Sequence, residues 1–426
     1  MPKNTSYSLP KDSKAWQQAL DSVASLLPSH IDNQALANLA SSDQNVSHQL
    51  LDALQSLPIF ALIVVLPKHS LLGSIQVDSD ASSLESQVDY YIQSWVDEQP
   101  NWQLARVTDD ANAERLEIPL TADISTPAVS EVSVQRYLLI PTTDTLMSPE
   151  KKTAAAHIID DQLTSRLRQK LQSHYLQSAV TQQSADGQQS VVTAPEEVVD
   201  CHILSIGHML RPHKLACFDM DSTLIEQEVI NELAKAAGIG EQVALITESA
   251  MRGEIDFDES FAQRIALLES LPITVLDDIC TQLTLSKGAQ FTIGALKALG
   301  YHTVLLSGGF TYFAHYIAQK LGIDEVHANE LDIDNDKVTG QVQLPIVNGE
   351  RKAMLTQKIA GQLGIEMSQV VCVGDGANDL AMMAVADLGV AYHAKPIVQA
   401  RADAAINVTG LEGVLYALGY PAPKCD

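Results

Sequence analysis

Basic residues are scarce in this chain. Its 426 residues include 27 Lys and Arg against 53 Asp and Glu, which gives a formal net charge of -26. Such a balance repels phosphate backbones and anionic lipid, so we expect no nucleic-acid partner and no membrane partner. An anionic small molecule could still bind, but only where a metal ion or a few local cations reverse the sign of the charge.

Long apolar runs and a secretion signal are also missing. The longest apolar run, residues 59–66, is bracketed by two prolines and is too short to span a bilayer as a helix, so we interpret it as a buried strand. The first residues, MPKNTSYSLPKDSKAW, contain no apolar signal region. The five cysteines are scattered without metal-type spacing, which is typical of reduced thiols. We therefore expect a soluble, cytoplasmic protein.

The sequence does have the composition of a folded protein, with 46% apolar residues, in a chain long enough for two or three domains. Residues 1–177 are predicted to form an α+β domain, with a helix over 84–96 and another from Ser148 to about 177. Residues 178–200 are rich in Gln, Ser and Ala and are interpreted as a linker. Strands in the first domain are predicted at 59–66, 103–107, 114–118 and 134–140.

From about residue 213 the pattern changes to continuous apolar strands that alternate with helices. This alternation predicts an α/β core with a doubly wound parallel sheet, which we assign to residues 201–225 and 291–426. Residues 226–290 are mostly helical in pattern and are interpreted as a cap above the carboxyl ends of the strands. The core strands are predicted at 215–218, 303–306, 370–373 and 388–391, and its helices at 310–321, 352–363 and 379–386.

Two aspartates follow the first core strand in LACFDMDSTLI. Alternate strand residues face the same way, so Asp219 and Asp221 should point together at the ligand edge of the sheet. A lone Asp after a strand is more often a turn or cap residue. The functional interpretation gains weight from three further signals that a parallel sheet would bring to the same edge.

The first signal is the turn Ser307-Gly308-Gly309, between an apolar strand and a helix, where backbone N–H groups can hold an anion. An ordinary tight turn explains it equally well.

The second signal is VGDGANDLAMM, where Asp375 and Asp379 flank Asn378 at a helix start and could cap it or bind a hard cation. We favour the metal, because Gly374 and Gly376 also admit a bulky ligand. The third is Lys352, by default a surface lysine, which could reach a phosphate.

Taken together, these residues form the set needed to hydrolyse a phosphate monoester, a reaction that can need about 10²¹-fold acceleration. A carboxylate nucleophile and a phosphate dianion repel each other, so a divalent ion and a lysine must reduce that repulsion before attack. The sequence therefore predicts that one aspartate attacks phosphorus and that its neighbour two residues on carries protons.

The motifs DMDSTL, the Ser307 turn, Lys352 and GDGAND resemble the four motifs of the haloacid dehalogenase superfamily of phosphatases, over roughly residues 213–415. Their order and spacing are most similar to the members that act on O-phospho-L-serine. The resemblance implies Mg²⁺-dependent hydrolysis to L-serine and phosphate, the last step of serine biosynthesis. Phosphohomoserine, phosphothreonine, or phosphoryl transfer to an alcohol are the alternatives.

The resemblance also implies a role for each motif residue. Asp219 would be the nucleophile that forms an aspartyl-phosphate, and Asp221 the proton carrier. Mg²⁺ would bind the Asp219 carboxylate, the Asp221 carbonyl and Asp375. The phosphoryl group would be held by Ser307, Gly308 and Lys352, with Asn378 nearby. Asp379 would orient Lys352 and the water shell of the metal.

Substrate choice is expected in the cap. The resemblance assigns recognition to Glu228 and Arg264, and their charges suit the ammonium and the carboxylate of phosphoserine. Met251 and Phe257 would form apolar walls. Taken alone, the two charged residues would be read as helix-surface groups.

Residues 1–200 lie outside the catalytic resemblance. Some relatives carry regulatory modules of the ACT type, with a ferredoxin-like fold, in this position. The mixed strand and helix pattern is compatible with such a module, which could bring feedback by L-serine or a homodimer. A plain packing domain remains the alternative.

Overall fold

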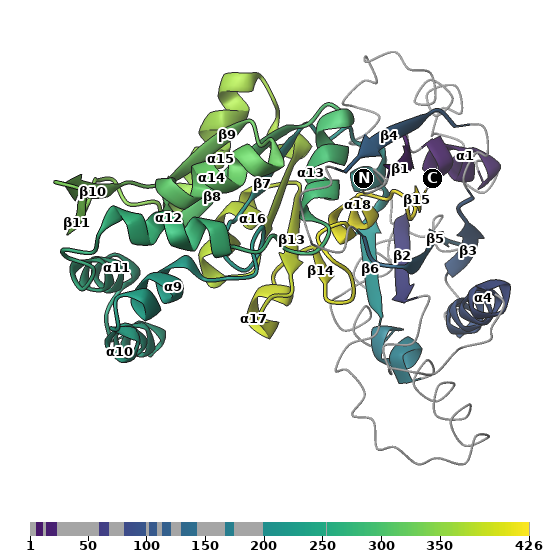
Figure 1. Cartoon of the computed structure of the whole chain (residues 1–426). Helices are drawn as coiled ribbons and strands as arrows, with labels where there is room; N and C mark the ends of the chain where they lie inside the picture. The colour runs from purple at the N-terminus through teal and green to yellow at the C-terminus, as the bar shows by residue number, and fades with distance from the viewer. Residues whose placement is uncertain are drawn as a thin grey trace, which may run out of the picture. The chain divides into compact units, whose positions relative to one another are not determined.

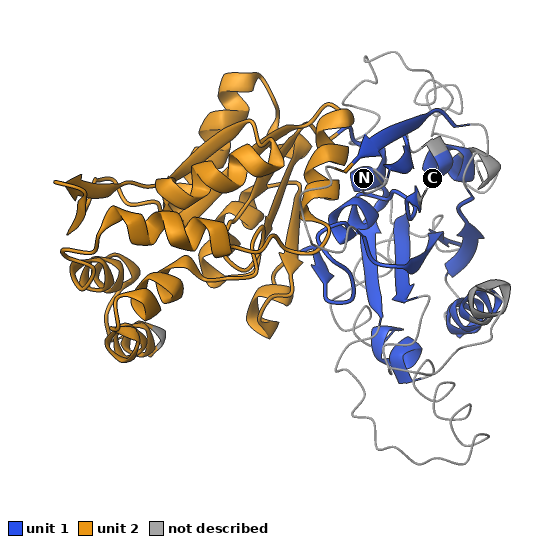
Figure 2. Cartoon of the chain, viewed as in Figure 1, with its two compact units in different colours: residues 1–119, 129–212, 403–426 blue, residues 120–128, 213–402 orange. Residues whose placement is uncertain are grey.

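A computed structural model describes residues 6–11, 14–23, 59–67, 81–98, 102–108, 113–120, 129–142, 167–173, 199–252 and 254–425. The chain divides into two compact units, coloured separately in Figure 2. Unit 1 comprises residues 1–119, 129–212 and 403–426, and unit 2 comprises residues 120–128 and 213–402. No helix within the described ranges has both the length and the apolar character needed to cross a membrane.

Unit 2 is organised around a parallel sheet with the strand order β13-β12-β7-β8-β9. The predicted doubly wound sheet is thus confirmed. The chain begins at β7 in the middle, builds β8 and β9 to one side, and then returns to build β12 and β13 on the other. The strand bounds are β7 Leu215–Phe218, β8 His302–Phe310, β9 Glu325–Asn329, β12 Val370–Gly374 and β13 Leu388–Tyr392. The short strand β14, Ala404–Ile406, is assigned to unit 1.

The reversal of strand order between β7 and β12 determines where a ligand can bind. At such a switch point the loops after neighbouring strands leave in opposite directions, which opens a crevice at the carboxyl ends. Two helix pairs cover the sheet, and the right-handed crossover rule puts them on opposite faces. The first pair is α13 (Ala289–Ala298) with α14 (Thr311–Leu321), and the second is α15 (Gly349–Leu363) with α16 (Leu380–Val385).

The segment between β7 and α13 forms the helical cap, as predicted. Figure 1 shows its four helices gathered on one side of the unit. The segment that leads into the cap and the segment that leads out of it are hydrogen-bonded to each other. Gln227 Oε1 accepts from the Thr284 backbone N–H at 3.0 Å, and Glu226 N–H donates to the Thr284 carbonyl at 3.0 Å. The cap helices are α9 (Val229–Ala236), α10 (Gly240–Met251), α11 (Phe257–Ala266) and α12 (Ile273–Gln282), and a hairpin of β10 (Leu331–Asp334) and β11 (Lys337–Val342) contacts α11.

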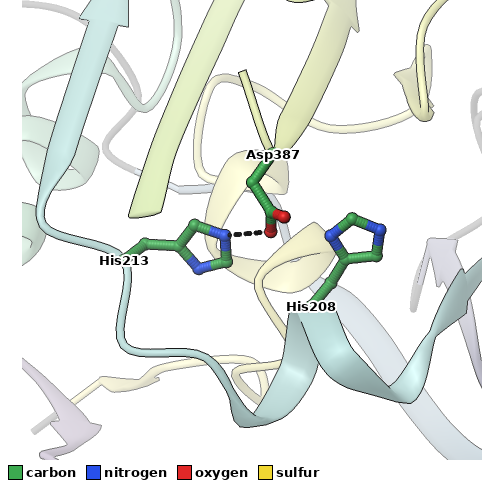
Figure 3. A group of neighbouring side chains, drawn as sticks. All are labelled: His208, His213 and Asp387. Atoms are coloured by element: carbon green, nitrogen blue, oxygen red, sulfur yellow. Dashed lines mark hydrogen bonds and ion pairs between the residues drawn. The ribbon is translucent and has the colours of Figure 1, made fainter. Parts of the chain in front are cut away.

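The amino ends of the same strands carry a buried imidazole–carboxylate pair. His213 precedes β7 and Asp387 precedes β13, and their Nε2 and Oδ2 atoms lie 2.9 Å apart (Figure 3). Their side chains are 2% and 8% exposed. This contact joins the starts of two strands that are not neighbours in the sheet, since β12 lies between β7 and β13.

Unit 1 contains a four-stranded antiparallel sheet with the order β3-β5-β2-β6. In chain order its elements are strand, helix, strand, strand, a short helical stretch at 167–173, and strand, which is the ferredoxin-like arrangement. Both helical segments pack on one face, where Ile92 and Leu171 join the same core. The bounds are β2 Phe60–Pro67, α4 Ala81–Asp97, β3 Trp102–Arg106, β5 Val132–Pro141 and β6 Asp200–Ser205.

A second, three-stranded sheet in unit 1 joins the two ends of the chain. It has the order β15-β1-β4 and is antiparallel throughout. Its strands are β1 (Ser6–Pro10), β4 (Arg115–Pro119) and β15 (Lys424–Cys425), and α1 (Lys14–Val23), α8 (Ile206–Leu210) and α18 (Gly413–Ala417) belong to the same unit.

The predicted elements occur at the expected places, but the units divide the chain elsewhere. Residues 201–212 and 403–426 were expected in the catalytic core, whereas they belong to unit 1. The physical reason is strand pairing, since β6 completes the unit 1 sheet beside β2 and β15 pairs with β1. The predicted linker falls almost wholly outside the described residues, and so does the helix predicted from Ser148, except for residues 167–173.

Candidate active site

A buried lysine lies between two aspartates at the carboxyl end of the unit 2 sheet. Asp219 follows β7 directly, and its Oδ1 lies 2.8 Å from Lys352 Nζ. The same ammonium lies 2.7 Å from Asp379 Oδ1. The Lys352 side chain is 0% exposed, so it is not the solvated surface lysine that a single lysine usually is. Helix α15, the GDGAND loop and β7 therefore meet at one ammonium group.

The pKa values of these groups show a site with too much negative charge. Burial alone would lower the pKa of Lys352, but Asp219 and Asp379 outweigh it and raise that pKa. Burial and the neighbouring Asp219 raise the pKa of Asp379 to about 7. The pKa of Asp375 also rises to about 7, because of burial and the charges of Asp219 and Asp379. One ammonium thus faces three carboxylates that resist being ionised together.

The residues present fit a divalent cation. Asp219, Asp375 and Asp379 each offer a carboxylate oxygen, and these oxygens all lie within 4.8 Å of one another. Clustered carboxylates are the ligands that hard cations such as Mg²⁺ prefer. A cation here would offset the negative charge that, together with burial, raises the pKa of Asp375 and of Asp379, so the donor chemistry and the electrostatics agree.

Asp221 and the Ser307 turn approach each other at Gly309. A Cβ atom on Gly309 would lie 3.0 Å from Ser307 Oγ and 3.2 Å from Asp221 Oδ2, so a side chain here would crowd both groups. Asp221 Oδ1 accepts a long hydrogen bond of 3.4 Å from the Val229 backbone N–H at the start of the cap. Burial, with Glu228 and Asp219 nearby, raises the pKa of Asp221 well above its usual value.

The GDGAND loop is compact because its glycines leave room for its own side chains. A Cβ atom on Gly374 would lie 2.3 Å from the Asp379 carboxyl, and one on Gly376 would lie 2.2 Å from Asn378 Oδ1. Gly349 admits the Asn378 carbonyl, which would be 2.9 Å from its Cβ. These contacts place the start of α15 against the loop.

The two charged cap residues, Glu228 and Arg264, are close enough to interact electrostatically. Glu228 Oε1 accepts from Ser222 Oγ at 2.8 Å, and burial raises the pKa of Glu228, although part of its side chain reaches solvent. Burial lowers the pKa of Arg264, and Glu228 opposes that shift. Arg264 Nε donates to the Ser260 carbonyl at 3.3 Å.

Phe257 lies over the glycine turn of the core. Its ring would be 3.7 Å from a Cβ atom on Gly308, and the side chain is 37% exposed. The residue after it, Asp258, accepts a hydrogen bond of 3.0 Å from Asn348 Nδ2. The amino end of α11 thus touches both segments predicted to hold phosphate. Met251 ends α10, and its side chain lies outside the described residues.

Sequence reasoning missed Ser222 and Asn348. Ser222 has φ of 54°, a left-handed conformation that is uncommon outside glycine and often marks a functional position. Its place next to Asp221 was the available signal. Asn348 caps α15 by accepting from Arg351 N–H at 3.0 Å, and the Asn-Gly pair that it forms with Gly349 was the available signal. The contacts of Ser222 with Glu228 and of Asn348 with Asp258 do not follow from spacing along the chain.

This fold and site define a hydrolase of the haloacid dehalogenase type, and the family description of the haloacid dehalogenase-like hydrolases matches residues 213–387. A probable phosphoserine phosphatase of Schizosaccharomyces pombe is 45% identical over 225 residues, which cover 52% of this chain and 76% of that protein. Phosphoserine phosphatase SerB2 of Mycobacterium tuberculosis is 46% identical over 226 residues, which cover 53% of this chain and 55% of that protein.

A solved structure extends the similarity to both units. The crystal structure of a probable phosphoserine phosphatase from Vibrio cholerae, in its unliganded form, aligns with a TM-score of 0.54 at 27% identity. The alignment covers 86% of this chain and 87% of that one. The chain therefore belongs to the phosphoserine phosphatase family of the haloacid dehalogenase-like hydrolases.

Proposed function

We propose that this protein hydrolyses O-phospho-L-serine to L-serine and phosphate, as the last step of serine biosynthesis. The observation that carries the proposal is the Lys352 ammonium held between Asp219 and Asp379 at the switch point of a parallel sheet. An ion pair kept this dry is costly to bury, which favours a functional origin over a structural one. The names of the similar proteins point to the same substrate.

In the first step of the proposed reaction, a carboxylate oxygen of Asp219 attacks phosphorus. The bond between phosphorus and the serine oxygen breaks, and Asp221 donates a proton to that leaving oxygen. Lys352, the Ser307 hydroxyl and the Gly308 backbone hold the phosphoryl oxygens, with Asn378 nearby. In the second step, water attacks phosphorus, Asp221 accepts the proton of the water, and the bond to Asp219 breaks.

We propose Mg²⁺ as the metal, held by the carboxylates of Asp219 and Asp375 and by the Asp221 carbonyl. When bound, it supplies positive charge that lowers the repulsion between nucleophile and phosphate. Asp379 keeps Lys352 ionised and in place, since its Oδ1 accepts from the ammonium and its Oδ2 accepts from Gly376 N–H at 3.0 Å.

Substrate selection is proposed for the cap. The carboxylate of Glu228, held by Ser222, suits the substrate ammonium, and the fork of Arg264 suits the substrate carboxylate. Phe257, which already lies over Gly308, and Met251 would exclude water from the phosphoryl group.

The test is kcat/KM with Mg²⁺ for O-phospho-L-serine, O-phospho-L-threonine, O-phosphohomoserine and p-nitrophenyl phosphate. Phosphoserine should lead the series by at least about tenfold, as the contacts of one charged group predict. Equal values for phosphoserine and p-nitrophenyl phosphate would contradict the proposal. A lead for phosphohomoserine or phosphothreonine would replace the substrate while keeping the reaction.

Arg264→Ala should raise KM for phosphoserine by about 10- to 100-fold and leave p-nitrophenyl phosphate hydrolysis nearly unchanged, because only phosphoserine has a carboxylate to bind. The matched control is Arg252→Ala, which removes an exposed cap arginine that pairs with Glu248 and Glu254. If Arg264→Ala lost the same fraction of its activity on phosphoserine and on p-nitrophenyl phosphate, Arg264 would have no role in selectivity.

Three further properties are proposed from the family resemblance and the fold. The ferredoxin-like part of unit 1 is proposed to sense L-serine or to form a homodimer, and phosphate release by the full chain with added L-serine tests the first. We propose a cytoplasmic location, since Cys201, Cys217, Cys280 and Cys372 are free thiols. The expectation that nucleic acid and membranes are not partners stays a prediction.

A further inference from the structure

One peptide unit in the Ser307 turn is held on both of its edges. The Gly308 carbonyl accepts a hydrogen bond of 2.9 Å from Asn329 Nδ2. The Gly309 N–H, which belongs to the same peptide unit, donates to Ser307 Oγ at 2.8 Å. A planar trans peptide directs its C=O and N–H in opposite directions, so the first bond helps to aim the second.

The asparagine that makes the first bond is buried at the end of a neighbouring strand. Asn329 is the last residue of β9, is 1% exposed, and pairs with Phe310 of β8. Regular pairing between β8 and β9 shifts register between Leu306 and Phe310, which is where the glycine turn lies. The Asn329 side chain therefore supplies a hydrogen bond to the turn where the strand ladder is irregular.

The other end of the same side chain reaches the second phosphate-binding segment. Asn329 Oδ1 accepts from the Val347 backbone N–H at 2.7 Å. Val347 directly precedes Asn348, the residue that caps the helix carrying Lys352. One buried amide thus joins the Ser307 turn to the start of α15, using both its donor and its acceptor.

We propose that Asn329 is a positioning residue for the phosphoryl group, and this inference rests on the proposed phosphatase function. By fixing the Gly308–Gly309 peptide, Asn329 makes Ser307 Oγ an acceptor for Gly309 N–H. The single proton of the Ser307 hydroxyl is then left to donate to a phosphoryl oxygen. Through Val347, Asn329 also fixes the distance between this hydroxyl and Lys352. Asn329 itself touches no reacting atom.

Two substitutions separate the two hydrogen bonds of the Asn329 side chain, the one to the Gly308 carbonyl and the one from the Val347 N–H. Asn329→Asp keeps an acceptor for Val347 N–H but replaces the donor to Gly308 with a second oxygen, whereas Asn329→Leu removes both hydrogen bonds at similar volume. The matched control is Asn335→Asp in the exposed β10–β11 turn, where Asn335 Nδ2 donates to Asp334 Oδ2 at 2.9 Å. Full-length protein is used throughout, and thermal unfolding is recorded for each variant.

The measurements are the dissociation constant of inorganic phosphate by calorimetry with Mg²⁺, and kcat/KM for phosphoserine and p-nitrophenyl phosphate. Asn329→Asp should weaken phosphate binding about tenfold and lower kcat/KM about 10- to 100-fold, as the loss of one buried hydrogen bond predicts. The loss should be equal for both substrates, because both present the same phosphoryl group. Asn329→Leu should show the same catalytic loss with a lower unfolding temperature.

The inference would be overturned if folded Asn329→Asp bound phosphate like the wild type, or if only phosphoserine hydrolysis fell. If Asn329→Asp did not fold, Asn329→Ser, which also lacks the reach to Gly308, would be held to the same outcomes. Phosphate binding needs no turnover, so failure of the wild type to hydrolyse phosphoserine would reject the proposed function and leave this inference to be judged by binding alone.

Discussion

The two ends of the unit 2 sheet both bury ionisable groups, but in different proportions. At the amino ends, one imidazole of His213 meets one carboxylate of Asp387. At the carboxyl ends, the single ammonium of Lys352 meets Asp219 and Asp379, and Asp375 completes a cluster of three acids. The first set is balanced in number, and the second has an excess of negative charge.

The difference separates a structural pair from a reactive site. An imidazole hydrogen-bonded to a carboxylate is a common way to accommodate polar groups in a folded core. An unmatched cluster of carboxylates gains stability from a cation, and the same cation and lysine then make the site attractive to phosphate. Changes at the carboxyl ends should therefore affect catalysis strongly, and changes at the amino ends should affect stability alone.

The largest expected effect is that of Asp219→Asn. An amide cannot act as the nucleophile, so kcat for phosphoserine should fall by more than about 10⁴-fold, as for other residues that act in a catalytic unit. Stopped-assay phosphate release measures this. Capture of a phosphorylated protein by mass spectrometry should succeed with the wild type and fail with the variant, and turnover above about one hundredth of wild type would rule out Asp219 as nucleophile.

Metal removal should rank next. Chelation by EDTA should lower phosphoserine hydrolysis by about 10³-fold, and Mg²⁺ should restore it, because the carboxylates then lack the cation that neutralises them. A readout without turnover is thermal unfolding, where Mg²⁺ at about a hundred times its dissociation constant should add ~2.7 kcal/mol of stability. Asp375→Asn should abolish this shift, and the exposed-site control Asp278→Asn should keep it.

Lys352→Met should reduce kcat/KM by about 10²-fold and destabilise the fold by about 3–5 kcal/mol, because it leaves buried carboxylates without their ammonium. Chemical denaturation measures the second effect. Adding Asp379→Asn should recover part of the stability but none of the activity. Lys358→Met, on the exposed face of the same helix, should change neither quantity, and an equal loss there would mean that the helix matters rather than the charge.

The smallest catalytic effect is expected at the other end of the sheet. His213→Gln removes the ring that contacts Asp387 and should lower the free energy of unfolding by about 1–3 kcal/mol, the cost of a lost buried hydrogen bond. Its kcat/KM should stay within about twofold of wild type when assayed well below the unfolding temperature. His315→Gln, at an exposed position of α14, controls for histidine loss. A large catalytic loss at His213 would break the distinction between the two ends.

Local pattern was enough to predict the elements and to nominate the charged residues. The strand at 215–218, for example, was recognisable because four apolar residues precede Asp219, and β7 occupies Leu215–Phe218. The domain boundary at residue 201 could not be predicted, because an apolar strand fits either sheet and only pairing with β2 assigns β6 to unit 1. Asn329 was likewise unremarkable in sequence, since its partners Gly308 and Val347 are distant along the chain.

The sequence by itself determined which chemistry is present: aspartates and a lysine placed just beyond apolar strands or at helix starts, at spacings that local rules of strand and helix impose. Only the tertiary structure decided that Lys352 is fully buried between two of those aspartates, that Asn329 joins the Ser307 turn to the start of α15, and that β6 belongs to unit 1. The physical reason is that periodicity depends on neighbours a few residues away, whereas burial, pKa and strand partnership depend on groups that folding brings together from far along the chain.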